Sequence, residues 1–151
     1  MTPATQIEDN RLSHTDIAFD IPQAAHINDR RRFVLDDGWL VIHPISTYLQ
    51  GTQVSDDLLD HEQGHYDIGL LVARALAPEL AALSALTAIE LKHKIVAVRD
   101  KHKIYRMEAI HKRYDRETKH GTDGIAQTLW NGVIRVTLAI PSPTSIMGLP
   151  L

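Results

Sequence analysis

The chain has 151 residues, of which 44% are apolar and 23% are charged, and these values suit one globular domain with a single core. It contains no cysteine, which excludes disulfide bonds and thiolate zinc sites, and its net charge of -3 gives no overall attraction to nucleic acid or anionic lipid. Imidazole and carboxylate groups are therefore the available metal ligands, and nine histidines are present.

The first residues are polar and acidic and lack the basic and apolar segments of a signal peptide. As written, the sequence indicates a cytoplasmic protein, or a periplasmic or secreted one if a leader was removed. The most apolar stretch, 68–91, contains charged residues and Pro78, which argues against a membrane span. We expect one domain over 1–151, with irregular structure at 1–12 and 141–151.

The first third of the sequence predicts short strands. Residues 17–21 have strand character and are followed by Pro22. Residues 32–35 and 39–43 flank an Asp-Asp-Gly segment, which is typical of a β-hairpin, and Pro44 is expected to end the second arm.

The middle of the sequence predicts two long helices. The first begins near Ser55, a typical N-cap residue that two acids follow, and is expected to stop at Pro78. The second runs from about 79 to 114. A turn at His120, a short helix over 123–130 and a strand over 133–140 complete the prediction. Strands at both ends with helices between them indicate an α+β domain, in which a small antiparallel sheet covers a helical layer.

The segment His-Glu-Gln-Gly-His at 61–65 lies on the first predicted helix and matches the pattern HExxH. Residues four apart on a helix lie on one face, so His61 and His65 can bind one zinc ion. Glu62 can then act as the general base that activates a zinc-bound water.

A catalytic zinc site needs a third protein ligand. His120 follows the long helix at a glycine-assisted chain reversal, from which its side chain can return to the first helix. The residues alone leave other candidates open. These are Glu90, Glu108, His111 and Asp115.

The HExxH segment is followed by a YDxxTxHG block at 114–121 and a QxxW block at 127–130. In this order, the three segments resemble a bacterial family of predicted zinc-dependent proteases. The resemblance spans roughly 58–131. It implies a zincin-like fold, peptidase activity on a peptide or protein substrate, and His120 as the third zinc ligand.

Other residues near these segments have supporting roles in this interpretation. Tyr114 is the candidate donor to the developing oxyanion. Asp67 and Asp115 are candidates for orienting the ligand imidazoles. Gln127 is expected to fix a turn and Trp130 to act as a packing anchor.

The sequence therefore predicts a metallopeptidase with one Zn²⁺ per chain and leaves its oligomeric state open. One alternative is a zinc-stabilised interaction module without turnover. Another is a binding protein for an acidic or nucleic-acid partner, because residues 92–119 contain ten basic and four acidic side chains. Few aromatic residues accompany these lysines and arginines, which does not favour nucleic acid.

Overall fold

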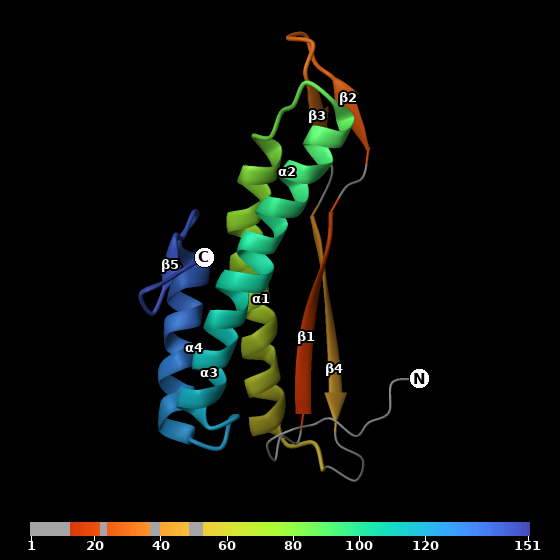
Figure 1. The fold of residues 1–151 in the computed structure, drawn as a ribbon. Coiled ribbons are helices and arrows are strands. Elements are labelled where there is room, and N and C mark those ends of the chain that lie inside the picture. The colour runs from red at the N-terminus through yellow and green to blue at the C-terminus, as the bar shows by residue number, and fades with distance from the viewer. Residues whose placement is uncertain (1–12, 22–23, 37–39, 49–52) are drawn as a thin grey trace.

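The computed structural model describes residues 13–21, 24–36, 40–48 and 53–151. Its N-terminal part is a long antiparallel β-ladder (Figure 1). Strand β1 (Ser13–Asp20) pairs with β4 (Val41–Tyr48) along its whole length. A second, separate two-stranded sheet is formed by β2 (Ala25–Ile27) and β3 (Phe33–Leu35).

The predicted hairpin between 32–35 and 39–43 is wrong, because β3 pairs with β2 and β4 pairs with β1. The chain reverses earlier, between β2 and β3. There the Asn28 side chain accepts hydrogen bonds from the backbone N–H groups of Arg30 and Arg32, and Arg31 has a φ of 56°. A local side-chain-to-backbone turn thus replaces the expected Asp-Gly turn.

Helix α1 (Asp56–Ala81) begins where the sequence predicts, and the Ser55 hydroxyl accepts a hydrogen bond from the Leu58 N–H. The predicted stop at Pro78 is wrong, because the helix continues for almost one further turn and the Ala82 N–H donates to the Pro78 carbonyl. Pro44 also fails to end a strand, since it lies within β4 opposite Ile17.

The second long helix begins later than expected, after an N-cap at Thr87. It consists of α2 (Ala88–Asp100), a π-helical segment η1 (Lys101–Met107) and α3 (Glu108–Thr118), which follow one another without a break. A π-helix holds more residues per turn than an α-helix. Each residue of η1 therefore turns the chain by a smaller angle than a residue of α2 or α3 does.

Helix α4 (Gly124–Ala139) is longer than the predicted short helix and includes residues expected to form a strand at 133–140. The side chains of Gln127, Trp130, Ile134 and Thr137 are buried at helical spacing, so packing outweighs the β propensity of this segment. The expected irregular tail contains one short antiparallel pair, β5 (Ser145–Ile146) and β6 (Leu149–Pro150).

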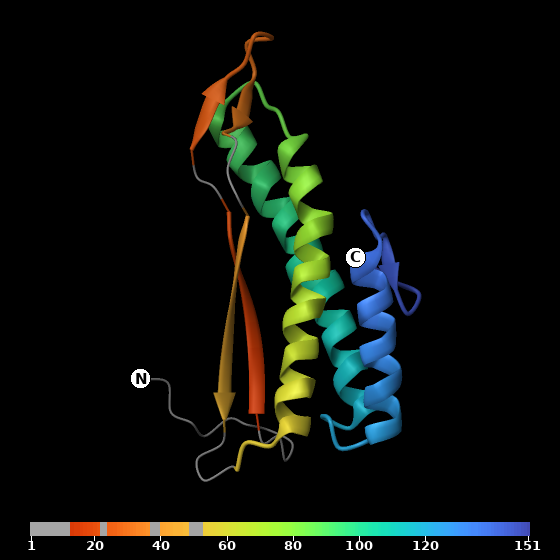
Figure 2. The ribbon, with the colours of Figure 1, turned by 180° about the vertical axis from the view of Figure 1, so that it is seen from behind.

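The protein is α+β, with α1 between the β1–β4 ladder on one side and α4 on the other (Figure 2). The helix formed by α2, η1 and α3 runs beside α1. The largest fully buried side chains include Trp130, Tyr114 and Ile17, which come from α4, α3 and β1. Among the described residues, no helix is long and apolar enough to cross a membrane.

Candidate metal centre

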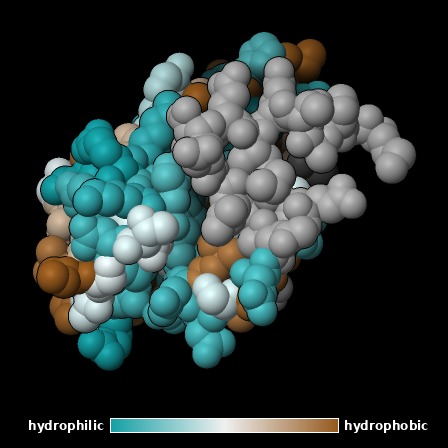
Figure 3. Space-filling model, turned by 90° about the horizontal axis from the view of Figure 1, so that it is seen from below, coloured by the Kyte–Doolittle hydropathy of each residue, from teal (hydrophilic) through white to brown (hydrophobic). Residues whose placement is uncertain are grey.

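A cleft of about 750 Å³ opens at the end of the molecule where α1 and α4 begin and α3 ends. Its walls come from β1, the first turns of α1, the turn after α3 and the first turns of α4. Figure 3 views this end from below, and most of the described surface in that view is hydrophilic. The residues that line the cleft come from all three sequence segments identified above, the HExxH, YDxxTxHG and QxxW segments.

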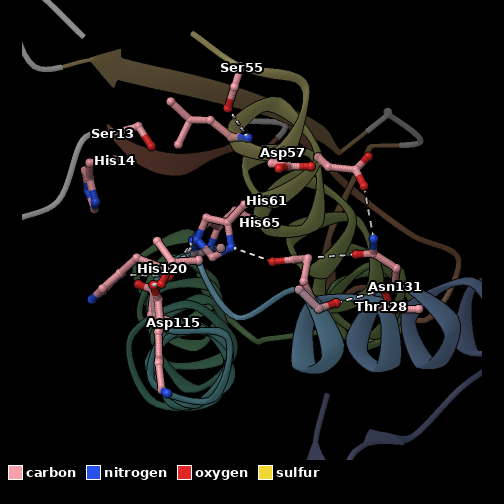
Figure 4. A pocket seen from close by; sticks show the side chains of 17 residues that line it. Ser13, His14, Ser55, Asp57, His61, His65, Asp115, His120, Thr128 and Asn131 are labelled. Carbon is pink, nitrogen blue, oxygen red and sulfur yellow. Dashed lines mark hydrogen bonds and ion pairs between the residues drawn. The ribbon is translucent and has the colours of Figure 1, made fainter. Parts of the chain in front are cut away.

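His61 and His65 lie on the second and third turns of α1 and point to the same place (Figure 4). The Nε2 atom of His61 is 3.1 Å from Oδ1 of Asp115, and the Nε2 atom of His65 is 2.8 Å from the same oxygen. The two histidines are only 2% and 6% exposed. Their spacing of four residues thus has the consequence expected for an α-helix.

Asp115 lies on α3, and its side chain is 12% exposed. Burial raises the pKa of its carboxyl, but contacts with the imidazoles of His61 and His65 outweigh burial and hold that pKa well below its usual range. Asp115 is therefore an ionised carboxylate at neutral pH and can serve as a ligand for a divalent cation.

His120 occupies a turn in the left-handed region after α3, with a φ of 55°. Its Nδ1 is 3.6 Å from Oδ1 of Asp115. The following Gly121 has a φ of 84°, and a Cβ at that position would come within 2.8 Å of Cβ of His61. The glycine therefore lets the turn approach α1, as the sequence suggested.

Ligand atoms of His61, Asp115 and His120 all lie within 4.8 Å of one another, so this group could hold a metal ion. His65 reaches the same Asp115 oxygen and lines the same cleft. The donor set of imidazole nitrogens and one carboxylate suits zinc.

The other candidate ligands lie in different surroundings. Glu90, at the start of α2, pairs with Lys94, and Glu108 is exposed. His111 on α3 places its Nδ1 2.7 Å from Nδ1 of His65. Burial lowers the pKa of His111 to about 3, so its ring is neutral at physiological pH and contacts His65 from the side away from Asp115.

Glu62 points towards β1. The hydroxyl groups of Ser13 and Thr15 donate hydrogen bonds to its carboxylate, and the residue is 6% exposed. Ser13 also lines the cleft, so the Glu62 carboxylate lies one side chain away from it. The predicted site does not include Ser13 or Thr15, although the alternation of Ser13, Thr15 and Ile17 indicates the face that β1 presents to α1.

Tyr114 is fully buried and its ring stacks on the ring of His61, with 4.7 Å between the ring centroids. Its hydroxyl donates to the His61 carbonyl at 2.9 Å and does not line the cleft. Burial raises the pKa of Tyr114, so the phenol keeps its proton. This geometry makes Tyr114 a residue that positions His61 and gives no support to the expected contact with an oxyanion.

Gly64 explains how Tyr114 reaches α1. A Cβ at this position would lie 2.1 Å from the Tyr114 hydroxyl oxygen, so only glycine leaves room for the ring.

Trp130 has its predicted role, whereas Gln127 and Asp67 do not have theirs. Trp130 packs against Tyr114 and donates from its indole N–H to Glu117, as expected of a packing anchor. Gln127 is buried and its Oε1 is 3.0 Å from Nδ1 of His61, so it contacts the site instead of fixing a turn. Asp67 accepts a hydrogen bond from Gln63 on the exposed surface of α1.

Many basic side chains of 92–119 form contacts within the chain. Salt bridges join Lys94 to Glu90, Lys101 to Glu79 and Arg113 to Glu117. Arg106 donates to the carbonyl of Leu151. Lys94, Lys101 and Arg113, three of the ten basic side chains of this segment, therefore have an acidic partner within the chain.

The fold and the site define an α+β protein with a buried cluster of histidines and one aspartate at the wall of a cleft. The chain belongs to a bacterial family described as a protein of unknown function, DUF922, whose match covers residues 14–121. That range includes the β-ladder, α1, the second long helix and His120. No curated protein and no solved structure shows a significant match to the chain.

Proposed function

We propose that this protein is a zinc-dependent peptidase that hydrolyses peptide bonds at the cleft. The observation that carries the proposal is the convergence of His61 Nε2 and His65 Nε2 on one oxygen of Asp115 in the cleft wall. The resemblance of the HExxH and YDxxTxHG segments to predicted zinc proteases supports the choice of reaction.

His61, His65 and Asp115 are the proposed zinc ligands. The two imidazole nitrogens approach Asp115 more closely than His120 does, at 2.8 and 3.1 Å against 3.6 Å. Three protein ligands with an open position are typical of catalytic zinc. His120 then lies at the edge of the ligand set, where it can join the ligands or contact a substrate.

When bound, zinc would polarise the substrate carbonyl and lower the pKa of a coordinated water. Glu62 follows the ligand His61 in the sequence and is the proposed general base. Its carboxylate would take a proton from the attacking water and return it to the leaving amine. Ser13 and Thr15 hold the carboxylate in one orientation beside the cleft.

The proposal is tested by separating metal binding from hydrolysis. His61→Ala and His65→Ala should each abolish zinc retention after dialysis against a mild chelator. Glu62→Gln should keep zinc and lower hydrolysis of a fluorogenic unfolded protein substrate by about 10² or more, because it removes the base and no ligand. Gln63→Ala, an exposed change at the next residue of α1, is the matched control and should retain both properties. Wild-type hydrolysis by Glu62→Gln would rule out the proposed mechanism.

A specific observation also favours the alternative of a zinc-stabilised interaction module. Two hydroxyl groups already occupy the carboxylate of Glu62, as is common for a buried structural acid. In that case wild-type protein should bind zinc, gain thermal stability from it and show no hydrolysis that depends on Glu62.

A further inference from the structure

A closed ring of hydrogen bonds starts and ends at His61. The Tyr114 hydroxyl donates to the His61 carbonyl at 2.9 Å, and Nε2 of Gln127 donates to the Tyr114 hydroxyl oxygen at 2.7 Å. Oε1 of Gln127 then faces Nδ1 of the His61 ring at 3.0 Å. Three side chains from α1, α3 and α4 thus form one network beside the candidate metal centre.

The direction of this ring follows from groups that can only accept. A backbone carbonyl accepts, so the single proton of Tyr114 goes to His61, and Gln127 must present its NH₂ group to the tyrosine oxygen. The same orientation follows from the other side of Gln127. Asp60 accepts from Nδ2 of Asn131 at 3.2 Å, which leaves Oδ1 of Asn131 to accept from Nε2 of Gln127 at 2.8 Å. Both constraints place the amide oxygen of Gln127 against His61.

Thr118 gives an independent indication that Nδ1 of His61 carries a proton. Its Oγ1 lies 3.5 Å from Nδ1 of His61 and donates its own proton to the Tyr114 carbonyl at 2.8 Å. Towards His61 it can therefore only accept. The Nδ1 atom of His61 thus faces two oxygens that accept.

We propose that Gln127 is a positioning residue that keeps a proton on Nδ1 of His61 and leaves the lone pair of the neutral ring on Nε2. This role rests on the proposed function, because that lone pair is the one directed at Asp115 and is available to bind zinc. Nε2 of His61 lies 3.1 Å from Oδ1 of Asp115, so a cation bound there would contact both atoms. The ring thus prepares His61 as a ligand before the metal arrives.

The test begins with the proton itself in ¹⁵N-labelled, metal-free protein at pH above 7. Long-range ¹H–¹⁵N correlation spectra distinguish protonated from bare ring nitrogens. Nδ1 of His61 should be protonated in the wild type and in Gln127→Glu, which keeps an acceptor there. In Gln127→Met the preference for Nδ1 should be lost. A bare Nδ1 in the wild type would overturn the proposal, whether or not the variants fold.

Zinc affinity supplies the second measurement, by competition with a chromogenic chelator. Gln127→Met should weaken zinc binding by roughly 10–100-fold, the usual effect of removing a partner of a ligand histidine, and Gln127→Glu should restore much of it. Gln63→Met makes the same change on the exposed surface and should have no effect. Wild-type affinity in Gln127→Met, with Nδ1 still protonated, would refute the positioning role. A wild-type protein with protonated Nδ1 that binds no zinc would refute the proposed function and leave the proton assignment supported.

Discussion

Helix α1 meets the second long helix at two contacts built from the same residue types. Near the end of α1, Glu79 contacts Nε2 of His102 at 3.0 Å and the ammonium group of Lys101. Near its beginning, His61 and His65 contact Asp115. We call these the upper and the lower contact, as they appear in Figure 1.

The two contacts differ in which group is buried and in how many nitrogens converge. At the upper contact the carboxylate is 39% exposed and a lysine of the chain supplies the cation. At the lower contact the carboxylate is 12% exposed, two imidazole nitrogens meet it, and a cleft lies alongside. At the upper contact, histidine and carboxylate groups therefore form an ion pair that joins two helices. At the lower contact, the same groups form a candidate set of metal ligands.

The largest expected difference is in zinc affinity. Asp115→Asn at the lower contact should weaken zinc binding by at least about 100-fold, since losing a ligand should cost more than losing a partner of a ligand. Glu79→Gln makes the same change at the upper contact and should leave zinc affinity unchanged. Isothermal titration with zinc measures both.

The role of His120 sharpens the same comparison. If His61, His65 and Asp115 are the ligands, His120→Ala should reduce zinc affinity less than Asp115→Asn does. The opposite order would make His120 the third ligand, as the sequence resemblance implies.

Packing at the lower contact can be tested through glycine. Gly64→Ala should destabilise the protein by about 1–3 kcal/mol, because the new Cβ would meet the Tyr114 hydroxyl. Gly132→Ala on α4 is the matched change, since its Cβ would meet nothing within 4 Å, and it should stabilise by up to about 1 kcal/mol. Urea unfolding of metal-free protein measures both values. Equal effects would mean that the approach of Tyr114 to α1 does not constrain the fold.

The smallest expected effect is the pH dependence of the upper contact. Burial lowers the pKa of His102, although its hydrogen bond to Glu79 opposes this shift. An unfolded histidine has a pKa of about 6.5, so the stability linked to neutral His102 is present above that pH and is lost as pH falls towards the folded pKa. In metal-free protein, His102→Leu should therefore lose less stability between about pH 7 and 5 than the wild type does.

The exposed His93 on the same helix supplies the control. The free energy of unfolding of His93→Leu should keep the wild-type dependence on pH. A wild-type slope in His102→Leu as well would show that the buried ring does not contribute to acid destabilisation.

Local signals predicted the parts of the fold that depend on neighbouring residues. Ser55 caps α1 because its hydroxyl reaches a backbone N–H three residues on, and this was visible in the sequence. The segment 133–140 was predicted as a strand from its β-branched residues. It is helical because Ile134 and Thr137 pack into the interior, a tertiary effect that propensity does not contain.

The sequence likewise predicts only part of the candidate site. The convergence of His61 and His65 follows from spacing on one helix, and the structure brings them together. Asp115 was one of several open choices, because its approach to α1 depends on how two helices are rotated relative to each other. The contact of Gln127 with His61 crosses 66 residues, and no local pattern indicates it.

The π-helical segment η1 has a consequence for how such proteins can change by insertion and deletion. A π-helical turn holds about one residue more than an α-helical turn, so the seven-residue segment η1 can take up an added residue while α2 and α3 keep their relative rotation. Removing one residue from η1 and closing it into α-helical turns would therefore leave Asp115 and Tyr114 facing α1. Removing one residue from α3 ahead of Tyr114 would instead turn both side chains by about 100°.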